Sequence, residues 1–397
     1  MILSRKIKSS IFLLIVSSFL VGCSNYKELN QLAIVVAMGI DYNEEAKLYD
    51  VTLQFVNPRG VPTNVSPGAS DLAALNVKGS GQTITEAVVE TALKLPRKNL
   101  YYHTSLIVVG EALAKKGISP IMDIFEREPK IRTSIPIILA RDVTANELLN
   151  IIPVFDKIPS KSLVGKLENT SDTFGGGNNV TVYKVISQLK SPGSEPVISG
   201  ASVKGDKKTG SAKSNLEHIT STHTYYNGMG IFHDGKLVGW LDGEKVKTIP
   251  ILSDKLKTMN ITIPCGSKEQ YQSILVSHSN RKIKVEMKRD VPDIGINVFI
   301  SGYLSEALCK EDISKETVIN DIQKRAENVM KTNIEQAIQE AQTLHSDIFG
   351  FGEVLYRSDP KTWKQVKGKW NELFSKANVA VKVEMDLEHT GMTTKHF

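Results

Sequence analysis

One apolar run dominates the hydropathy of this chain, and it lies near the N-terminus, at residues 11–21. Its eleven residues are too few for a helix that crosses a bilayer, which needs about 20. A basic segment with Arg5, Lys6 and Lys8 precedes the run, and no second run of this kind follows it. This order is typical of a secretory signal peptide. The sequence therefore predicts a leader at residues 1–22 and a water-soluble body, and it excludes a protein with several membrane spans.

The leader ends in a motif that predicts lipid attachment. Leu20, Val21 and Gly22 stand directly before Cys23, which matches the bacterial lipobox, where small residues line the cleavage site and the cysteine thiol is acylated. We expect cleavage after Gly22 and a mature chain that begins with Cys23 as N-palmitoyl, S-diacylglycerol cysteine. Several acyl chains give the stable anchoring that one chain does not. The alternative is an ordinary signal peptide in which the cysteine occurs by chance.

Length and composition indicate an ordinary globular protein. The 397 residues are 41% hydrophobic and 23% charged, which excludes collagen-like, disulfide-dense and wholly disordered chains. At about 100–200 residues per domain, the length predicts two or three domains. The formal net charge is +6, and removal of the leader with its three basic residues leaves +3. This excess is too small to indicate a nucleic-acid-binding protein.

The pattern of the first half predicts a mixed α/β region at residues 23–203, as one unit or two. Apolar and alternating segments at 32–40 and 49–55 read as a β-hairpin. Capping-box sequences begin helices at Thr83 and Thr144, and buried strands follow the first of them at 105–109 and 135–140. The basic, glycine-bearing segment that follows predicts a linker or a long hairpin at 204–227.

The second half, residues 228–397, predicts an antiparallel sheet packed with one long helix. Asp234 and Gly235 stand between two apolar runs, which is a strong hairpin signal. Apolar side chains then recur every three or four residues, at Ile319, Ile322, Ala326, Met330, Ile334, Ala337, Ala341 and Leu344. We interpret this stripe as a core face on the sheet, with a partner-binding surface as the alternative. A last strand at 379–387 returns to the sheet, so the predicted fold class is multi-domain α+β.

The sequence contains no motif of a known catalytic, metal or cofactor site. It has no G-x-S-x-G, H-E-x-x-H or C-x-x-C. The glycines at 175–177 lack the Gly-Lys-Ser/Thr ending of a phosphate loop, so we interpret them as a surface turn. Cys265 and Cys309 are the cysteines that remain after Cys23. A disulfide between them and two unpaired thiols both remain open.

Several segments together resemble the Ger(x)C lipoproteins, the C subunits of the germinant receptors of spore-forming bacteria. The resemblance starts at Cys23, with Glu28-Leu29-Asn30-Gln31-Leu32 and Gly39-Ile40-Asp41. It continues through Thr83-x-x-Glu86-Ala87, the run HTSLIVVGEA at 103–112, the run from Gly230 to Leu241, the long helix and Thr390-Gly391. It covers nearly the whole mature chain. One departure is Ser24-Asn25, where members often carry Trp-Asp.

The resemblance implies a lipid-anchored receptor subunit on the outer face of the spore's inner membrane. Such a subunit works beside two integral membrane subunits, of A and B type, in a complex that senses nutrients, and it is not known as an enzyme. It needs no cofactor, and nothing implies contact with nucleic acid. A second hypothesis is a solute-binding lipoprotein of a transporter, which requires two similar α/β lobes around a hinged cleft. A third, a secreted cell-wall hydrolase, requires an acidic or metal centre that the sequence does not reveal.

Overall fold

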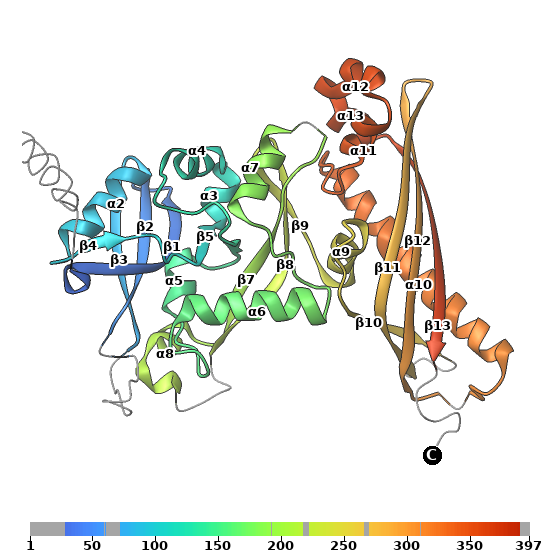
Figure 1. The fold of residues 1–397 in the computed structure, drawn as a ribbon, viewed down its shortest axis with the longest axis horizontal. Helices are drawn as coiled ribbons and strands as arrows, with labels where there is room; N and C mark the ends of the chain where they lie inside the picture. Colours follow the sequence, from blue (N-terminus) through green and yellow to red (C-terminus); the bar gives the residue numbers. More distant parts are fainter. Residues whose placement is uncertain are drawn as a thin grey trace, which may run out of the picture.

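The computed structural model describes residues 28–58, 60, 72–191, 193–216, 222–265, 270–309 and 311–389. Over these residues the chain forms two β-sheets, of nine and four strands, with helices packed on both (Figure 1). The larger sheet belongs to the N-terminal half and the smaller one to the C-terminal half. This arrangement confirms the predicted multi-domain α+β class.

The nine-stranded sheet has the order β3-β2-β1-β5-β6-β7-β8-β9, with β4 paired to β1 outside this path. Its strands are β1 (Leu32–Asn43), β2 (Leu48–Val56), β3 (Ala74–Gly81), β4 (Lys98–Leu100), β5 (Leu106–Gly110), β6 (Ile137–Ala140), β7 (Val197–Lys204), β8 (His223–His233) and β9 (Lys236–Leu241). The predicted hairpin of β1 and β2 is confirmed. Strands β1, β5, β6 and β7 are parallel, so their carboxyl ends meet at one edge of the sheet.

Helices cover both faces of this sheet, which explains the fully apolar central strands. They are α2 (Ile84–Leu93), α3 (Glu111–Lys116), α4 (Ser119–Arg127), α5 (Ala145–Asn150), α6 (Pro159–Thr173), α7 (Val182–Lys190) and α8 (Lys207–Ser211), with the 3-10 turns η1 (Leu29–Gln31) and η2 (Lys213–Leu216). In β5, Ile107 and Val109 pack with α2, α3, α4 and α7. The alternate residues Leu106 and Val108 pack with α5 and α6 on the other face.

The four-stranded sheet has the order β10-β11-β12-β13. Its elements are η3 (Gly243–Lys247), α9 (Thr248–Leu252), β10 (Met259–Pro264), β11 (Tyr271–Lys288), β12 (Val291–Ala307), α10 (Glu316–Thr343), α11 (Phe351–Ser358), α12 (Pro360–Val366), η4 (Lys367–Lys369), α13 (Trp370–Phe374) and β13 (Asn378–His389). The apolar stripe of α10 packs in one core with the strands of this sheet, and all its members except the partly buried Ile319 and Leu344 are buried, which confirms its interpretation as a core face.

Strand β13 differs from the predicted antiparallel sheet. Strands β10, β11 and β12 are antiparallel neighbours, but β13 runs parallel to β12. The cause is the connection, because α10 to α13 carry the chain back to the start of β12 before β13 begins. A helical crossover of this kind joins parallel strands, whereas a short turn joins antiparallel ones.

The first sheet continues beyond the segment 204–227. Strands β8 and β9 fall largely in the expected C-terminal region, yet they extend the N-terminal sheet, because β8 pairs antiparallel with β7 and β9 pairs antiparallel with β8. The segment after β7 contains α8 and η2 and connects β7 to its antiparallel neighbour β8. Asp234 and Gly235 form the predicted β8–β9 turn, with φ of 48° and 73°.

The two sheets share one apolar core. Met229 and Ile231 of β8 and Leu241 of β9 are buried together with residues of β11 and α10. Ser346, which follows α10, donates from its Oγ to the Phe232 carbonyl oxygen. The C-terminal half is therefore packed directly on the last two strands of the N-terminal sheet.

A disulfide joins Cys265, next to the end of β10, to Cys309, just beyond β12. Their Cα atoms are 6.3 Å apart, within the range that a disulfide spans, and both residues are buried. The bond closes a loop over a sequence separation of 44 residues. The structure thus answers the question that the sequence left open.

Replacing both cysteines by serine is expected to lower the free energy of unfolding by about 2–4 kcal/mol, because the unfolded chain gains the freedom of the opened loop. Urea denaturation of the oxidised protein and of the Cys265→Ser/Cys309→Ser variant measures this difference. Reduced wild-type protein should behave like the variant. Equal stability of the oxidised protein and the variant would contradict the prediction.

Candidate functional site

Cys23, the predicted lipid-attachment residue, lies outside the described residues, as does its cleavage site after Gly22. Both therefore stay predictions. The described chain begins at Glu28, five residues beyond Cys23. Within the described part, no helix combines the length and the apolar character that crossing a membrane requires.

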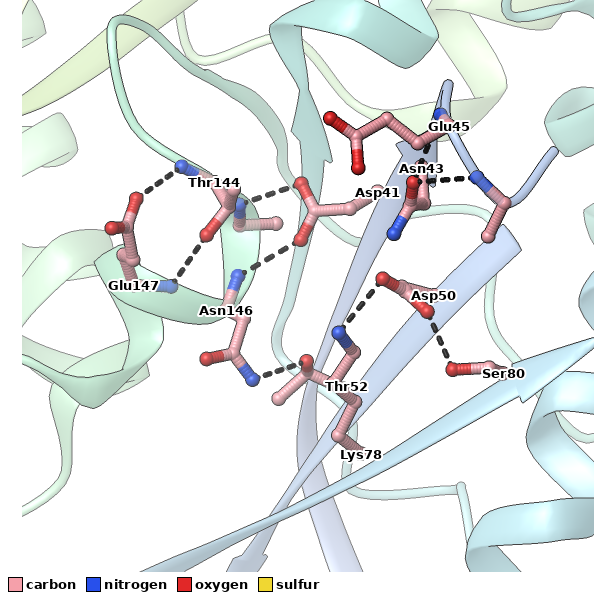
Figure 2. A network of polar contacts seen from close by, with 12 residues as sticks. Asp41, Asn43, Glu45, Asp50, Thr52, Lys78, Ser80, Thr144, Asn146 and Glu147 are labelled. Carbon is pink, nitrogen blue, oxygen red and sulfur yellow. Dashed lines mark hydrogen bonds and ion pairs between the residues drawn. The ribbon is translucent and has the colours of Figure 1, made fainter. Parts of the chain in front are cut away.

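A buried carboxylate at the carboxyl end of β1 organises one polar network (Figure 2). Asp41 accepts hydrogen bonds from the backbone N–H groups of Ala145 (2.8 Å) and Asn146 (3.1 Å) at the start of α5. Burial raises the pKa of Asp41, and these two hydrogen bonds oppose the rise. The Asn146 side chain donates to the Thr52 hydroxyl at 2.9 Å. Asp41 therefore fixes the first turn of α5 against the sheet.

The predicted capping box completes the same helix start. The Thr144 hydroxyl accepts from the Glu147 backbone N–H at 3.0 Å, and the Glu147 carboxylate accepts from the Thr144 N–H at 2.9 Å. On the neighbouring strand, Asp50 accepts from the Ser80 hydroxyl at 2.6 Å and pairs with Lys78 at 2.7 Å. Figure 2 shows that every carboxylate of this network except Glu45 points at a donor.

Two glycines make room for this network. A Cβ on Gly110, at the end of β5, would lie 2.1 Å from Oδ1 of Asp41. A Cβ on Gly39 would lie 3.0 Å from Leu149 and 3.1 Å from Ala145, both on α5. The Gly39-Ile40-Asp41 motif and Gly110 of the 103–112 motif thus form one packing unit between β1, β5 and α5.

A second cluster joins the carboxyl ends of β5 and β6 to β9. The Arg141 guanidinium carbon lies 4.4 Å from the ring centroid of Trp240, and Nη2 donates to Oδ2 of Asp242 at 3.1 Å. The Trp240 indole N–H donates to Glu111 at 3.4 Å, and Glu111 also pairs with Lys115 at 2.8 Å. Stacking and bidentate pairing use the planar guanidinium of arginine, which lysine does not provide.

A third cluster lies where the two halves of the chain meet. Glu195 accepts from the Asn371 amide at 2.9 Å, and the same amide nitrogen is 3.2 Å from Nδ1 of His233. Burial raises the pKa of Glu195, and the hydrogen bond from Asn371 opposes this rise. The cluster borders a hollow of about 550 Å³ that Lys367 and Trp370 also line.

This cluster is the one group of described side chains with ligand atoms close enough to hold a metal ion. Atoms of Glu195, His233 and Asp234 lie within 4.8 Å of one another. The Asn371 amide already bridges Glu195 and His233, and Asp234 is mostly exposed. The arrangement therefore acts as a polar contact between the β8–β9 turn and α13.

Asp347 is the most buried carboxylate in the described chain, and it holds together the turn between α10 and α11. Its Oδ1 accepts from the N–H groups of Gly350 (2.8 Å) and Phe351 (3.1 Å). Its Oδ2 accepts from Gly352 N–H (2.8 Å) and the Trp370 indole N–H (2.8 Å). Burial raises the pKa of Asp347 to about 6 against these four hydrogen bonds. Its backbone carbonyl also accepts a hydrogen bond from the Glu195 N–H at 2.9 Å, which connects the α10–α11 turn to the N-terminal half.

These acidic groups did not stand out in the sequence as site residues, because their partners come from distant segments. Thr144 and Glu147 gave a local signal, but Arg141, Glu195 and Asp347 gave none. The glycines at 175–177 follow α6, a helix, so the strand, loop and helix order of a phosphate loop is missing there.

Comparison with known families decides the identity. A model described as "Spore germination protein N-terminal domain" matches residues 25–203, and one described as "Spore germination B3/ GerAC like, C-terminal" matches residues 227–391. The chain belongs to the Ger(x)C family. This family comprises germinant receptor C subunits and is not a known class of enzymes.

Individual relatives agree with the family assignment. Spore germination protein KC of Bacillus subtilis is 27% identical, with 98% of this chain and 97% of the relative covered. Spore germination protein B3 of the same organism is 23% identical over 95% and 96% of the two chains. The crystal structure of the GerBC protein matches with a TM-score of 0.54 at 18% identity, covering 88% of this chain and 96% of that one. The last likeness shows the same fold.

In this Ger(x)C protein, the motifs that carry the family resemblance meet in the fold. Glu111 from the 103–112 motif and Trp240 from the 230–241 motif contact each other, and Gly110 leaves room for Asp41. These motifs therefore serve packing and helix capping. The segments 39–41, 103–112 and 230–241 all lie near the carboxyl ends of the parallel strands.

Proposed function

We propose that this chain is a membrane-anchored lipoprotein subunit of a nutrient germinant receptor. It acts without catalysis beside two integral membrane subunits, on the outer face of the spore's inner membrane. The observation that carries the proposal is the family match that begins at residue 25, two residues after the lipobox cysteine at Cys23. Relatives named as spore germination proteins cover nearly the whole chain.

The buried acidic groups support a non-catalytic role. Asp41 caps a helix and Asp347 accepts four hydrogen bonds from one turn and a tryptophan. Glu195 is held by Asn371. A general acid or base must reach a substrate proton, whereas these carboxylates serve the fold.

Anchoring gives such a subunit a positional mechanism. Confinement to the membrane raises the effective concentration of the body toward membrane partners, so a modest interface suffices for assembly. The acyl chains supply about 0.8 kcal/mol per buried CH₂. A solute-binding lipoprotein is less well supported, because the nine-stranded and four-stranded halves are not similar lobes.

Substitution of Cys23 tests the proposal. In Cys23→Ala spores we expect the protein to leave the inner-membrane fraction and nutrient-triggered germination to be lost, because no thiol is present for acylation. Membrane fractionation, mass spectrometry of the N-terminal peptide and germination on single nutrients measure these effects. The neighbouring Ser24→Ala variant keeps the lipobox and should behave like wild type. Normal germination of an unanchored Cys23→Ala protein would contradict the proposal.

A further inference from the structure

An exposed apolar and basic surface lies where the described chain begins. We define the α2 face as Val89 and Leu93 of α2, Arg97 and Lys98 after it, and Tyr102 beyond β4. Leu93 is 82% exposed, Val89 54% and Tyr102 52%. Val89 and Leu93 are four residues apart and so lie on one side of α2. The opposite side of the helix buries Ile84, Ala87 and Thr91 in the core. Packing of α2 on the sheet therefore does not use the side chains of Val89 and Leu93.

The charged residues of the α2 face are basic. Arg97 and Lys98 are exposed and form no ion pair within the described chain. Glu90, the acidic residue between Val89 and Leu93, is paired with Lys94 at 2.9 Å. The surface therefore combines aliphatic, aromatic and cationic side chains, a combination that suits the boundary between lipid headgroups and acyl chains.

Chain connectivity places this surface beside the predicted anchor. Strand β4 pairs in parallel with the start of β1, so that Lys98 is opposite Leu32. Glu28 precedes Leu32 by the single turn η1. Five residues connect Cys23 to Glu28, and an extended segment of that length reaches at most about 18 Å. An acylated Cys23 therefore holds the α2 face close to the bilayer.

We propose that the α2 face docks on an anionic lipid surface, with Leu93 and Val89 in the headgroup region and Arg97 and Lys98 on lipid phosphates. This inference rests on the proposed lipid anchor. With the α2 face docked, the protein contacts the membrane at two places, the acylated Cys23 and the α2 face, and these two contacts together fix the orientation of the body. Since α2 and β4 lie at one end of the long axis and β13 at the other, this orientation directs the C-terminal sheet away from the anchor (Figure 1).

A site-specific probe tests the docking in the full acylated protein. A Leu93→Cys variant carrying an environment-sensitive fluorophore is reconstituted into vesicles that contain phosphatidylglycerol, with nitroxide-labelled lipids as quencher. The control carries the same label at Tyr356→Cys on α11, where the residue is 53% exposed. We expect a blue shift and several-fold stronger quenching at position 93 than at position 356. Removing the two charges in the Arg97→Gln/Lys98→Gln variant should lower the equilibrium constant for docking on these vesicles by about fivefold per charge.

Three outcomes would overturn the docking. A label at position 93 that stays in water while mass spectrometry finds the acyl groups on Cys23 excludes the lipid contact and leaves the anchor intact. Shielding that arises only after addition of the integral membrane subunits assigns the surface to a protein partner. Absence of acyl groups on Cys23 removes the anchor itself, and the proposed function fails together with the docking.

Discussion

Replacing Asp347 by alanine is expected to lower the free energy of unfolding by about 3–5 kcal/mol. The backbone N–H groups of Gly350 and Phe351 donate to its Oδ1, and the Gly352 N–H and the Trp370 indole N–H donate to its Oδ2. All four donors belong to buried residues. Each buried donor that loses its acceptor costs about 1–3 kcal/mol. Relief from burying the charge offsets part of this loss, which gives the net value. Urea denaturation followed by tryptophan fluorescence measures it, because Trp370 contacts Asp347 directly.

Asp359 supplies a matched control in the same part of the chain. Its exposed side chain accepts from Thr362 N–H at 3.1 Å as the N-cap of α12. Asp359→Ala should therefore cost about 1 kcal/mol, the usual value of a lost N-cap. Similar losses for the two variants would show that Asp347 is no more than an ordinary cap.

The pH dependence separates the charge of Asp347 from its hydrogen bonds. Burial raises its pKa to about 6 in the folded state from an ordinary value of 3.8, so the folded protein binds this proton more tightly than the unfolded chain does. The stabilisation is fully present below pH 3.8 and is lost as the pH rises through about 6. It amounts to about 3 kcal/mol. Asp347→Asn cannot ionise and should lack this loss between the two pH values.

The second large effect is expected from Gly110→Ala, at about 2–4 kcal/mol of lost stability. The φ of Gly110 is −65°, which alanine adopts freely, so the cost is steric and not conformational. The new methyl group would lie 2.1 Å from the Asp41 oxygen that caps α5. Either the carboxylate moves and the cap is lost, or β5 separates from β1.

Gly165 supplies the control for this prediction. It lies inside α6, where a Cβ would meet nothing within 4 Å, so Gly165→Ala should raise stability by about 0.5–1 kcal/mol. In a double-mutant cycle, Gly110→Ala should cost less when Asp41→Ala is present, because the clash is gone. Thermal unfolding of the four proteins gives the coupling, and additive losses would contradict the predicted contact.

Local patterns predicted the elements that depend on neighbours in the sequence. The capping residues Thr83 and Thr144, the β8–β9 turn at Asp234 and the apolar stripe of α10 are all present where the pattern placed them. Turn geometry, helix capping and side-chain periodicity act over a few residues, so the sequence contains their full physical cause.

Strand partners and buried polar contacts could not be predicted in this way. The assignment of β8 and β9 to the first sheet depends on the pairing of β8 with β7 and of β9 with β8. The direction of β13 depends on the path of four helices. Asp347 resembles any surface aspartate until Trp370, 23 residues away, donates to it.

The sequence alone determined the lipobox prediction at Cys23, the α+β class, the helix caps and the family resemblance, because each is a property of consecutive residues. The tertiary structure alone decided which strands share a sheet, that Cys265 and Cys309 pair, and that Asp41 and Asp347 are buried acceptors. It also brought Lys98 beside Leu32 at the start of β1. The physical reason is that burial and long-range hydrogen bonds arise only when distant segments pack together.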